Sequence, residues 1–398
     1  MKVLVVSDAH IFRTEDNKFW CNTAMHGYSF WCRYLEVFEQ VAVIARVKEI
    51  TNREAKEKKY IRADGDGVEV VSLPFIRGMK GYLLHFLQMK KECQKVAKNG
   101  ECAIFRLPSI PAYLVLREYL KSKKPFAVEV VIDPEDEYSN IPILKQVSVC
   151  LLKKVCKRAN GVSYVTKYYL QEKYPCTHKL EPMKKGYFES YYSSIDLSED
   201  FFYHDREYKC KRNEIKILHV ANSINNMNKG HAIVLKIIEE LKKENIKASV
   251  VFVGNGDLIG KFMNDACEMG IDDRVEFVGY VSDKNEIRNY MINSDMFVFP
   301  TRAEGLPRVL IEAMATGLPC LSSNVDGIPE LLDKEYLFSP DDVNGYVNKV
   351  LELIGNEKKL ENMGMSNIER AKEYKRDILN LRRKKFYENL KSVTKYID

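Results

Sequence analysis

The stretch Pro300–Cys320 reads PTRAEGLPRVLIEAMATGLPC and follows the apolar run Met296–Phe299. An apolar run, a polar turn and a second apolar segment closed by glycine predict a strand, a turn and a helix. Glu304 falls in the turn, and Glu312 falls eight residues later in the helix. Because helical side chains tilt toward the helix N-terminus, we expect both carboxylates to face one cleft.

The start of this predicted helix has the properties of an anion site. Pro307 suits the first helical position and Gly317 suits the end. The first turn has unpaired N–H groups and the positive end of the helix dipole. Carboxylates beside it need another role, such as accepting hydrogen bonds from sugar hydroxyls. The alternative, that Glu304 is a solvated turn residue and Glu312 an exposed helix position, stays open from these residues alone.

Short apolar runs alternate with amphipathic segments in two series along the chain. The expected strands are Val3–Val6, Val41–Val47, Val68–Leu73, Cys102–Arg106 and Phe126–Ile132, then Ile215–Val220, Ala248–Val253, Val275–Val278, Met296–Phe299 and Cys320–Ser322. Such runs, linked by helices, are typical of parallel sheets covered on both faces. With 398 residues, we expect an α/β protein with two doubly wound domains, residues 1–205 and 206–375, and a helix over 376–398 that crosses back to the first domain.

Composition limits the function classes. The chain is 45% hydrophobic with a net charge of +6, which favours an anionic small substrate or membrane surface over nucleic acid. Ten scattered cysteines and no long apolar run predict a cytoplasmic protein. The segments Gly81–Lys91 and Leu151–Arg158 mix apolar residues with lysines. They leave open a peripheral contact with the inner membrane, beside the ordinary interpretation as helices with a basic outer face.

Polar or flexible residues follow each expected strand of the second series. Asn222 ends the first strand, and Lys229 lies in the loop before the next helix. Gly254 ends the second strand, and Gly279 and Tyr280 end the third. In an open α/β sheet, ligands bind at the carboxyl ends of the strands. The sequence therefore predicts one ligand site at this edge.

These residues resemble the retaining glycosyltransferases of family 4, also called group 1, which have the GT-B fold of two facing Rossmann-like domains. The resemblance covers Ile215–Glu330. It is carried by the E-x7-E motif from Glu304 to Glu312, by G-L-P at Gly305–Pro307 and by D-G-I-P-E at Asp326–Glu330.

The resemblance implies a role for each residue of the motif. Glu304 would bind hydroxyls of the donor sugar, Glu312 the ribose, and Lys229 the diphosphate, helped by N–H groups after Gly305. Other expected contacts of the nucleotide sugar are Asn222, Gly254, Gly279, Tyr280, Leu306, Pro307 and, from the first domain, Gly27. A UDP- or GDP-sugar would be the donor substrate. Lys229 and the helix dipole would stabilise the leaving diphosphate, so no metal or cofactor is expected.

Two positions depart from the family pattern. The family has an arginine where this chain has Asn222, and Arg302 or Arg308 could replace it. The family also has a histidine near the end of a middle strand of the first domain, where this chain offers Arg106 or Asp133.

The activity implied is retaining transfer of a hexose-type sugar from a nucleotide sugar to a glycan or lipid-linked acceptor. The expected pathway is assembly of a bacterial capsule, O-antigen or exopolysaccharide. A nucleotide-sugar epimerase of the same fold and a non-catalytic GT-B-like binding protein remain as alternatives. A dinucleotide-dependent oxidoreductase is disfavoured, because Val5–His10 contains no G-x-G-x-x-G loop.

Overall fold

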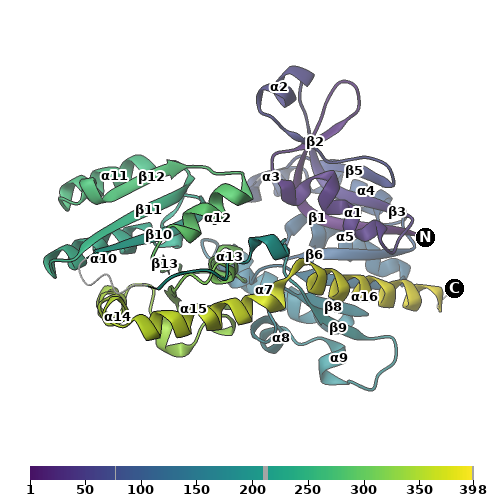
Figure 1. Ribbon diagram of the computed structural model, residues 1–398. Helices are drawn as coiled ribbons and strands as arrows, with labels where there is room; N and C mark the ends of the chain where they lie inside the picture. Colours follow the sequence, from purple (N-terminus) through teal and green to yellow (C-terminus); the bar gives the residue numbers. More distant parts are fainter. Residues whose placement is uncertain (77, 209–213, 397–398) are drawn as a thin grey trace. The chain divides into compact units, whose positions relative to one another are not determined.

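The computed structural model describes residues 1–76, 78–208 and 214–396 (Figure 1). The chain divides into two compact units, Met1–Tyr192 with the chain from Asn380 onward, and Ser193–Leu379. The division lies earlier than 205/206 because the intervening segment is bonded to the second unit. Arg288, for example, donates to the carbonyls of Phe201 at 2.9 Å and Phe202 at 3.1 Å. The last two residues of the predicted C-terminal helix, 397–398, lie outside the described residues.

The first unit is a Rossmann-like α/β domain. Its strands are β1 (Lys2–Arg13), β2 (Phe19–Cys21), β3 (Gln40–Glu49), β4 (Ile61–Arg62), β5 (Val68–Pro74), β6 (Cys102–Leu107), β7 (Phe126–Val130), β8 (Gly161–Tyr164) and β9 (Phe188–Tyr191). The parallel strands lie in the order β5-β3-β1-β6-β7-β8-β9, and β2 pairs antiparallel with the distal half of β1.

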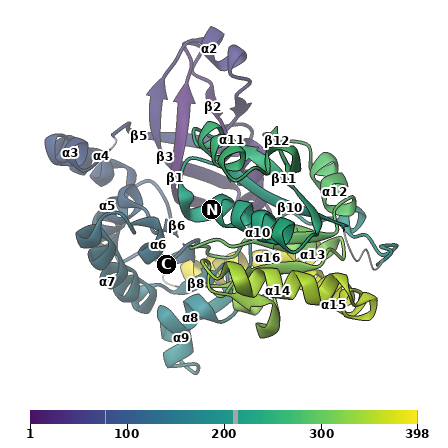
Figure 2. The same ribbon diagram turned by 90° about the vertical axis from the view of Figure 1, so that its left-hand side faces the viewer.

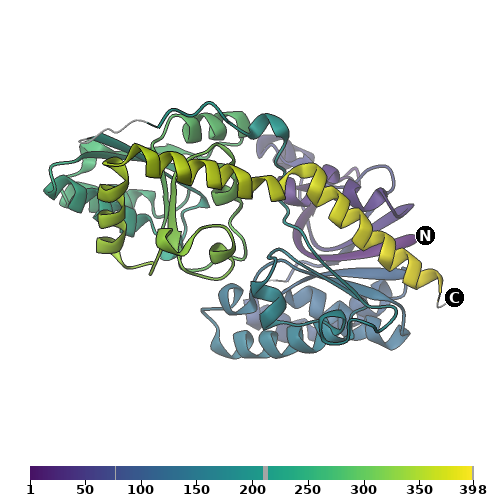
Figure 3. The same cartoon turned by 60° about the horizontal axis from the view of Figure 1, so that its bottom comes forward.

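Helices cover both faces of this sheet. They are α1 (Tyr28–Leu35), α2 (Asn52–Glu57), α3 (Gly78–Leu84), α4 (Phe86–Val96), α5 (Ile110–Tyr119), α6 (Pro134–Glu137), α7 (Pro142–Arg158), α8 (Tyr169–Lys173), α9 (Thr177–Leu180) and the later part of α16 (Arg376–Lys395). The buried sides of α4, α5 and α7 join one hydrophobic cluster with the sheet. α1 and α16 cover the other face (Figure 3), where the rings of Tyr34 and Tyr387 stack at 4.8 Å.

The second unit is a second Rossmann-like domain. Its strands are β10 (Glu214–Ser223), β11 (Lys247–Asn255), β12 (Val275–Gly279), β13 (Met296–Phe299), β14 (Cys320–Ser323) and β15 (Leu337–Phe338), all parallel, in the order β12-β11-β10-β13-β14-β15. Its helices are α10 (His231–Lys243), α11 (Ile259–Glu268), α12 (Lys284–Ile292), α13 (Arg308–Ala315), α14 (Val343–Ile354) and α15 (Glu357–Ala371). α11, α10 and α14 lie on one face, and α12, α13 and α15 lie on the other (Figure 2).

The predicted strands are all present, which confirms the α/β class and the two doubly wound domains. The strands gave a clear signal because parallel strands covered on both faces are apolar throughout. β13 and β14, for instance, are buried at every residue. The helix predicted after Met296–Phe299 is α13. It begins at Arg308, so Pro307 is its N-cap rather than its first residue. Gly317 follows its end with a positive φ of 66°.

Candidate functional site

The candidate site lies at the carboxyl edge of the second sheet, between β10 and β13. These strands are neighbours, yet β10 connects to β11 on one side and β13 to β14 on the other. Such a reversal of strand order leaves a crevice at the carboxyl ends, where α/β sheets bind ligands. Lys229 lies in the loop after β10, and Glu304 lies in the loop after β13.

The two loops are bonded to each other by their backbones. The Asn228 carbonyl accepts hydrogen bonds from the Arg302 N–H at 2.8 Å and the Thr301 hydroxyl at 3.2 Å. Gly230 has a φ of 82°, and a Cβ there would lie 2.3 Å from the Pro300 carbonyl oxygen. Only glycine permits this approach without displacing backbone, so the sequence fixes the position of the lysine loop against β13.

Lys229 and Glu304 form an ion pair at this edge. Their side chains are 31% and 15% exposed, so solvent or a ligand reaches both. The Glu304 N–H donates to Asp326 Oδ2 at 2.9 Å, which holds the turn. Burial raises the pKa of Glu304 above its ordinary value; Lys229 and Arg308 oppose this rise, and Asp326 adds to it. The pair is thus a partly desolvated cation and carboxylate held by backbone.

Glu312 lies in the second turn of α13, and its environment also opposes ionisation. Burial raises its pKa to about 7, against the opposing charges of Arg308 and Lys284 and with the support of Asp196. The charge of Arg308 thus opposes the rise in pKa of both acids of the motif. A carboxyl with a pKa near neutrality is typical of a functional position.

Arg302 and Arg308, the two candidates for the missing arginine, lie in different environments. Asn222 is exposed at the end of β10. Arg302 binds both carboxylate oxygens of Asp341 at the surface, so its guanidinium is already engaged. Arg308 is half-buried, and its charge lowers the pKa of both Glu304 and Glu312.

The two predicted glycines Gly254 and Gly279 differ in why their positions require glycine. Gly254 has a φ of 145°, and a Cβ there would lie 1.8 Å from the Ala221 carbonyl oxygen. Close packing of β11 on β10 therefore requires glycine at position 254, whether or not a ligand binds there. Gly279 has a φ of 81° and open space at the Cβ position, and the Tyr280 side chain is 63% exposed. These two remain available to line a pocket.

The turn before α13 can contact a ligand through backbone groups rather than through side chains. Gly305, Leu306 and Pro307 are all buried. Because Pro307 is the N-cap and α13 starts at Arg308, the N–H groups of the first turn are the available donors. Gly27 is the N-cap of α1 in the first unit.

Two buried histidines support the lysine loop, and neither was predicted as part of the site. His219 of β10 and His231, the first residue of α10, have ring centroids 4.5 Å apart, and His231 stacks on Phe262 at 5.2 Å. Burial lowers the pKa of His219 to about 4 and that of His231 to about 2. Both are neutral aromatic packing residues at physiological pH. Their surroundings come from distant strands, so the sequence carried no signal for them.

The two candidates for the family histidine in the first unit have structural roles. Arg106 at the end of β6 pairs with Glu129 of β7, which also accepts hydrogen bonds from the hydroxyls of Tyr34, Tyr192 and Tyr387 at 2.9–3.1 Å. Burial alone would raise the pKa of Glu129, but Arg106, the Tyr387 hydroxyl and further arginines hold it below its ordinary value.

Asp133 is fully buried and satisfied locally. It caps α6 by accepting from the Glu135 N–H at 2.9 Å, accepts from the Tyr174 hydroxyl at 2.6 Å and lies 2.7 Å from Lys173 Nζ. Its carboxylate thus anchors the loop after β7.

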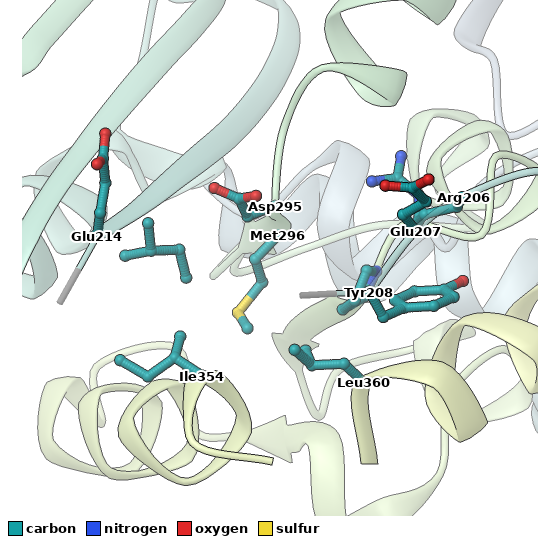
Figure 4. Close-up of a pocket in the computed structure, with 10 residues that line it drawn as sticks. Arg206, Glu207, Tyr208, Glu214, Asp295, Met296, Ile354 and Leu360 are labelled. Carbon is teal, nitrogen blue, oxygen red and sulfur yellow. The ribbon is translucent and has the colours of Figure 1, made fainter. Parts of the chain in front are cut away.

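A separate pocket lies at the opposite edge of the second sheet (Figure 4). Glu214 and Met296, at the amino ends of β10 and β13, line it, and Met296 points between Ile354 and Leu360. Arg206, its cation, already donates to three carbonyls. The pocket is therefore not part of the ligand edge.

Within residues 1–76, 78–208 and 214–396, no group of three His, Cys, Asp or Glu side chains is arranged to hold a metal ion. Over the same residues, no helix combines the length and apolar character needed to cross a membrane.

Comparisons with known proteins agree with this geometry. Residues 214–356 match the family model described as glycosyl transferases group 1, so this part of the chain is a group 1 glycosyltransferase domain. Protein CapJ of Staphylococcus aureus is 28% identical over 99% of this chain and 96% of its own length. The capsular polysaccharide biosynthesis glycosyltransferase CapH of the same species is 36% identical, over 29% of this chain and 32% of its own.

Solved structures share the whole architecture. The crystal structure of Anabaena HepE in complex with UDP and glucose covers 98% of this chain and all of its own, with a TM-score of 0.65 and 15% identity. The lipopolysaccharide outer core galactosyltransferase WaaB covers all of both chains with a TM-score of 0.61 and 14% identity. The fold is therefore GT-B.

Proposed function

We propose that the chain is a retaining glycosyltransferase that transfers a hexose-type sugar from a nucleotide sugar to a glycan or lipid-linked acceptor. The observation that carries this proposal is the Lys229–Glu304 pair at the strand-order reversal, with Glu312 on the helix that follows. The match of residues 214–356 to the group 1 model supports it.

The residues divide the work by charge. Lys229 and the first-turn N–H groups of α13 bind the donor diphosphate and stabilise the charge that develops as the nucleoside diphosphate leaves. Glu304 accepts hydrogen bonds from donor-sugar hydroxyls, and Glu312 accepts from the ribose. Without donor, Glu304 neutralises Lys229; with donor, the phosphates take over that role. Arg308 supplies the second cation that Asn222 lacks.

A UDP- or GDP-sugar is the proposed donor, without a further cofactor. The solved structure of HepE contains UDP and glucose, and the E-x7-E motif resembles that of the retaining family. Similarity to CapH, named as a capsular polysaccharide biosynthesis glycosyltransferase, supports a place in surface polysaccharide assembly. The proposed location is the cytoplasm, with contact at the inner membrane surface.

Donor binding and turnover test the proposal together. Calorimetry with UDP-, GDP-, ADP- and TDP-sugars should identify one preferred donor. Labelled donor incubated with a membrane extract as acceptor source should then give a labelled glycan, and NMR should find the anomeric configuration of the donor retained. Glu304→Gln should abolish transfer while the variant stays folded.

The alternatives give different results in the same assays. An epimerase would convert the sugar of the free nucleotide sugar without acceptor. A binding protein would take up donor but form no product with any extract. An inverted product would contradict the retaining mechanism.

A further inference from the structure

Glu129, the buried carboxylate of the first unit, has no hydrogen-bonding capacity left. Its Oε2 accepts from Arg106 and, at 3.1 Å, from the Tyr34 hydroxyl. Its Oε1 accepts from the hydroxyls of Tyr192 at 3.1 Å and Tyr387 at 2.9 Å. Because a carboxylate has about four lone-pair positions, Glu129 cannot accept from a further cation beside it.

Arg33 of α1 is such a cation. Its guanidinium carbon lies 3.8 Å from the centroid of the Phe30 ring, and the guanidinium of Arg106 lies over the same ring at 5.0 Å. Within the part of the chain that the structure describes, no group accepts a hydrogen bond from Arg33, and its buried Nε has no partner. Because arginine stays charged in proteins, such a guanidinium is unfavourable unless a ligand or water supplies the acceptor.

The surroundings of Arg33 add positive charge rather than remove it. Arg383 of α16, which is 5% exposed, lies one helical turn before Tyr387. The ring of Tyr387 stacks at 4.8 Å on that of Tyr34, the residue after Arg33, so the two arginines belong to one seam between α1 and α16. Burial lowers the pKa of Arg33, and the charges of Arg383 and Arg106 lower it further, against the two tyrosines.

A phosphate group has the chemistry that this seam lacks. A guanidinium is a planar fork of donors that binds a phosphate through two parallel hydrogen bonds. Arg33 is only partly buried, so a ligand can approach it from solvent. The negative charge of a phosphate would offset the neighbouring guanidiniums, whereas a neutral sugar hydroxyl would leave their charge uncompensated.

We propose that Arg33 binds a phosphate or diphosphate group at the seam between α1 and α16, with Arg383 adding positive charge. The first unit alone forms this site, whereas Lys229 and α13 of the second unit form the proposed donor site. Binding needs no donor and no turnover. Two sources offer the group: a free inorganic anion that acts as an effector, and the diphosphate of a lipid-linked acceptor, which alone rests on the proposed function.

Pyrophosphate binding to the full-length protein tests the proposal once the donor site is weakened by Lys229→Ala. Isothermal titration calorimetry of this variant at about 0.15 M salt should still find one site. Adding Arg33→Gln should raise the Kd of that site by about tenfold or more, because charge-assisted hydrogen bonds are lost. Adding Arg53→Gln instead, at an exposed ion pair with Glu57 on α2, should leave the Kd within about twofold. The absence of a site in Lys229→Ala, or equal losses in the two arginine variants, would overturn the proposal.

Thermal unfolding separates a ligand site from a packing role. Arg33→Met keeps an unbranched side chain against Phe30 but removes the charge. In the Lys229→Ala background and without anion, it should melt at least as high as its parent, because an unpaired charge is lost. Inorganic phosphate should raise the melting temperature of the parent, and Arg33→Met should remove most of that gain. A variant that melts lower and gains as much from phosphate would leave Arg33 as a packing residue and overturn the proposal.

A short-chain prenyl diphosphate distinguishes the two sources. Binding tighter than that of pyrophosphate by about tenfold or more, lost in Arg33→Gln, would assign the site to a lipid-linked acceptor. Affinity equal to that of pyrophosphate or lower, also lost in Arg33→Gln, would assign it to a free anion. A protein that binds pyrophosphate through Arg33 but transfers no sugar would contradict the proposed function and support this site.

Discussion

Each unit has an acid and a cation paired near the carboxyl edge of its sheet, and the two pairs differ in how much they leave unsatisfied. Glu129 is 4% exposed and accepts from Arg106 and three tyrosine hydroxyls. Glu304 is 15% exposed, and its cation Lys229 is 31% exposed. A carboxylate has about four lone-pair positions. Glu129 has filled them, whereas Lys229 and Glu304 are still open to a ligand.

The comparison separates a structural ion pair from a candidate binding pair by environment, not by residue type. Removing one member of a saturated buried pair leaves an uncompensated charge. Removing one member of an accessible pair lets the other reach water. The first change should act on stability and the second on turnover.

The largest expected effect is at Glu129. Glu129→Ala leaves Arg106 without its carboxylate and three tyrosines without their acceptor. We expect a loss of about 3–5 kcal/mol in the free energy of unfolding, measured by urea titration of the full-length protein. Glu199→Gln, at an exposed pair with Lys375, is the matched control and should leave the midpoint unchanged. A loss at Glu129 no larger than at Glu199 would show that the buried Glu129 pair contributes no more to stability than an exposed pair.

Lys229→Ala should lower kcat by about 10²–10³-fold, since it removes the cation beside the leaving diphosphate. The free energy of unfolding should change much less than in Glu129→Ala, because Glu304, whose pKa burial already raises, can take up a proton once Lys229 is gone. Lys236→Ala, at an exposed position of α10, is the control and should retain full turnover. Near-normal turnover of Lys229→Ala would assign the diphosphate to another cation, with Arg308 the next to change.

Because Glu312 is buried, we expect it to make the free energy of unfolding depend on pH. Its folded pKa of about 7 lies above the ordinary 4.5, so the charged form is disfavoured in the fold, and stability present below pH 4.5 is lost as the pH rises through 7. Glu312→Gln should therefore raise the unfolding free energy of the ligand-free protein by about 1–3 kcal/mol at pH 8 and leave it unchanged at pH 4. The same variant should bind donor more weakly by calorimetry. Undiminished donor affinity would remove the ribose assignment; the exposed Glu268→Gln serves as control.

The smallest effect concerns the support under the lysine loop. His231 is buried, and burial lowers its pKa from 6.5 to about 2. The unfolded chain takes up a proton below pH 6.5 and the folded chain does not, so stability falls as the pH falls. His231→Phe keeps the ring stacking and should resist this loss, gaining about 1 kcal/mol per pH unit below 6.5 relative to the native chain. Equal acid sensitivity of both proteins, by thermal unfolding from pH 6.5 to 5, would contradict the neutral packing role.

The strands of both units and the helix after β13 could be predicted from the sequence because their signals are local. A doubly buried parallel strand is an apolar run, and a glycine after an apolar helix marks its end. The pairing of Lys229 with Glu304 was expected only as two contacts of one donor, and these site assignments remain predictions. Arg106 could not be assigned in advance: its partners Glu129 and Tyr34 are distant in sequence, and its environment is set by packing.

The hydroxyl of Tyr387 reaches Glu129 from a helix encoded more than half the chain later. During synthesis, the first unit therefore has its buried acid before it has the last donor for that acid. The second unit, which lies between them in the sequence, is complete by residue 379 and needs no such wait. The first unit therefore cannot saturate its buried acid until the last helix of the chain has packed, which makes α16 the final element of that unit to join.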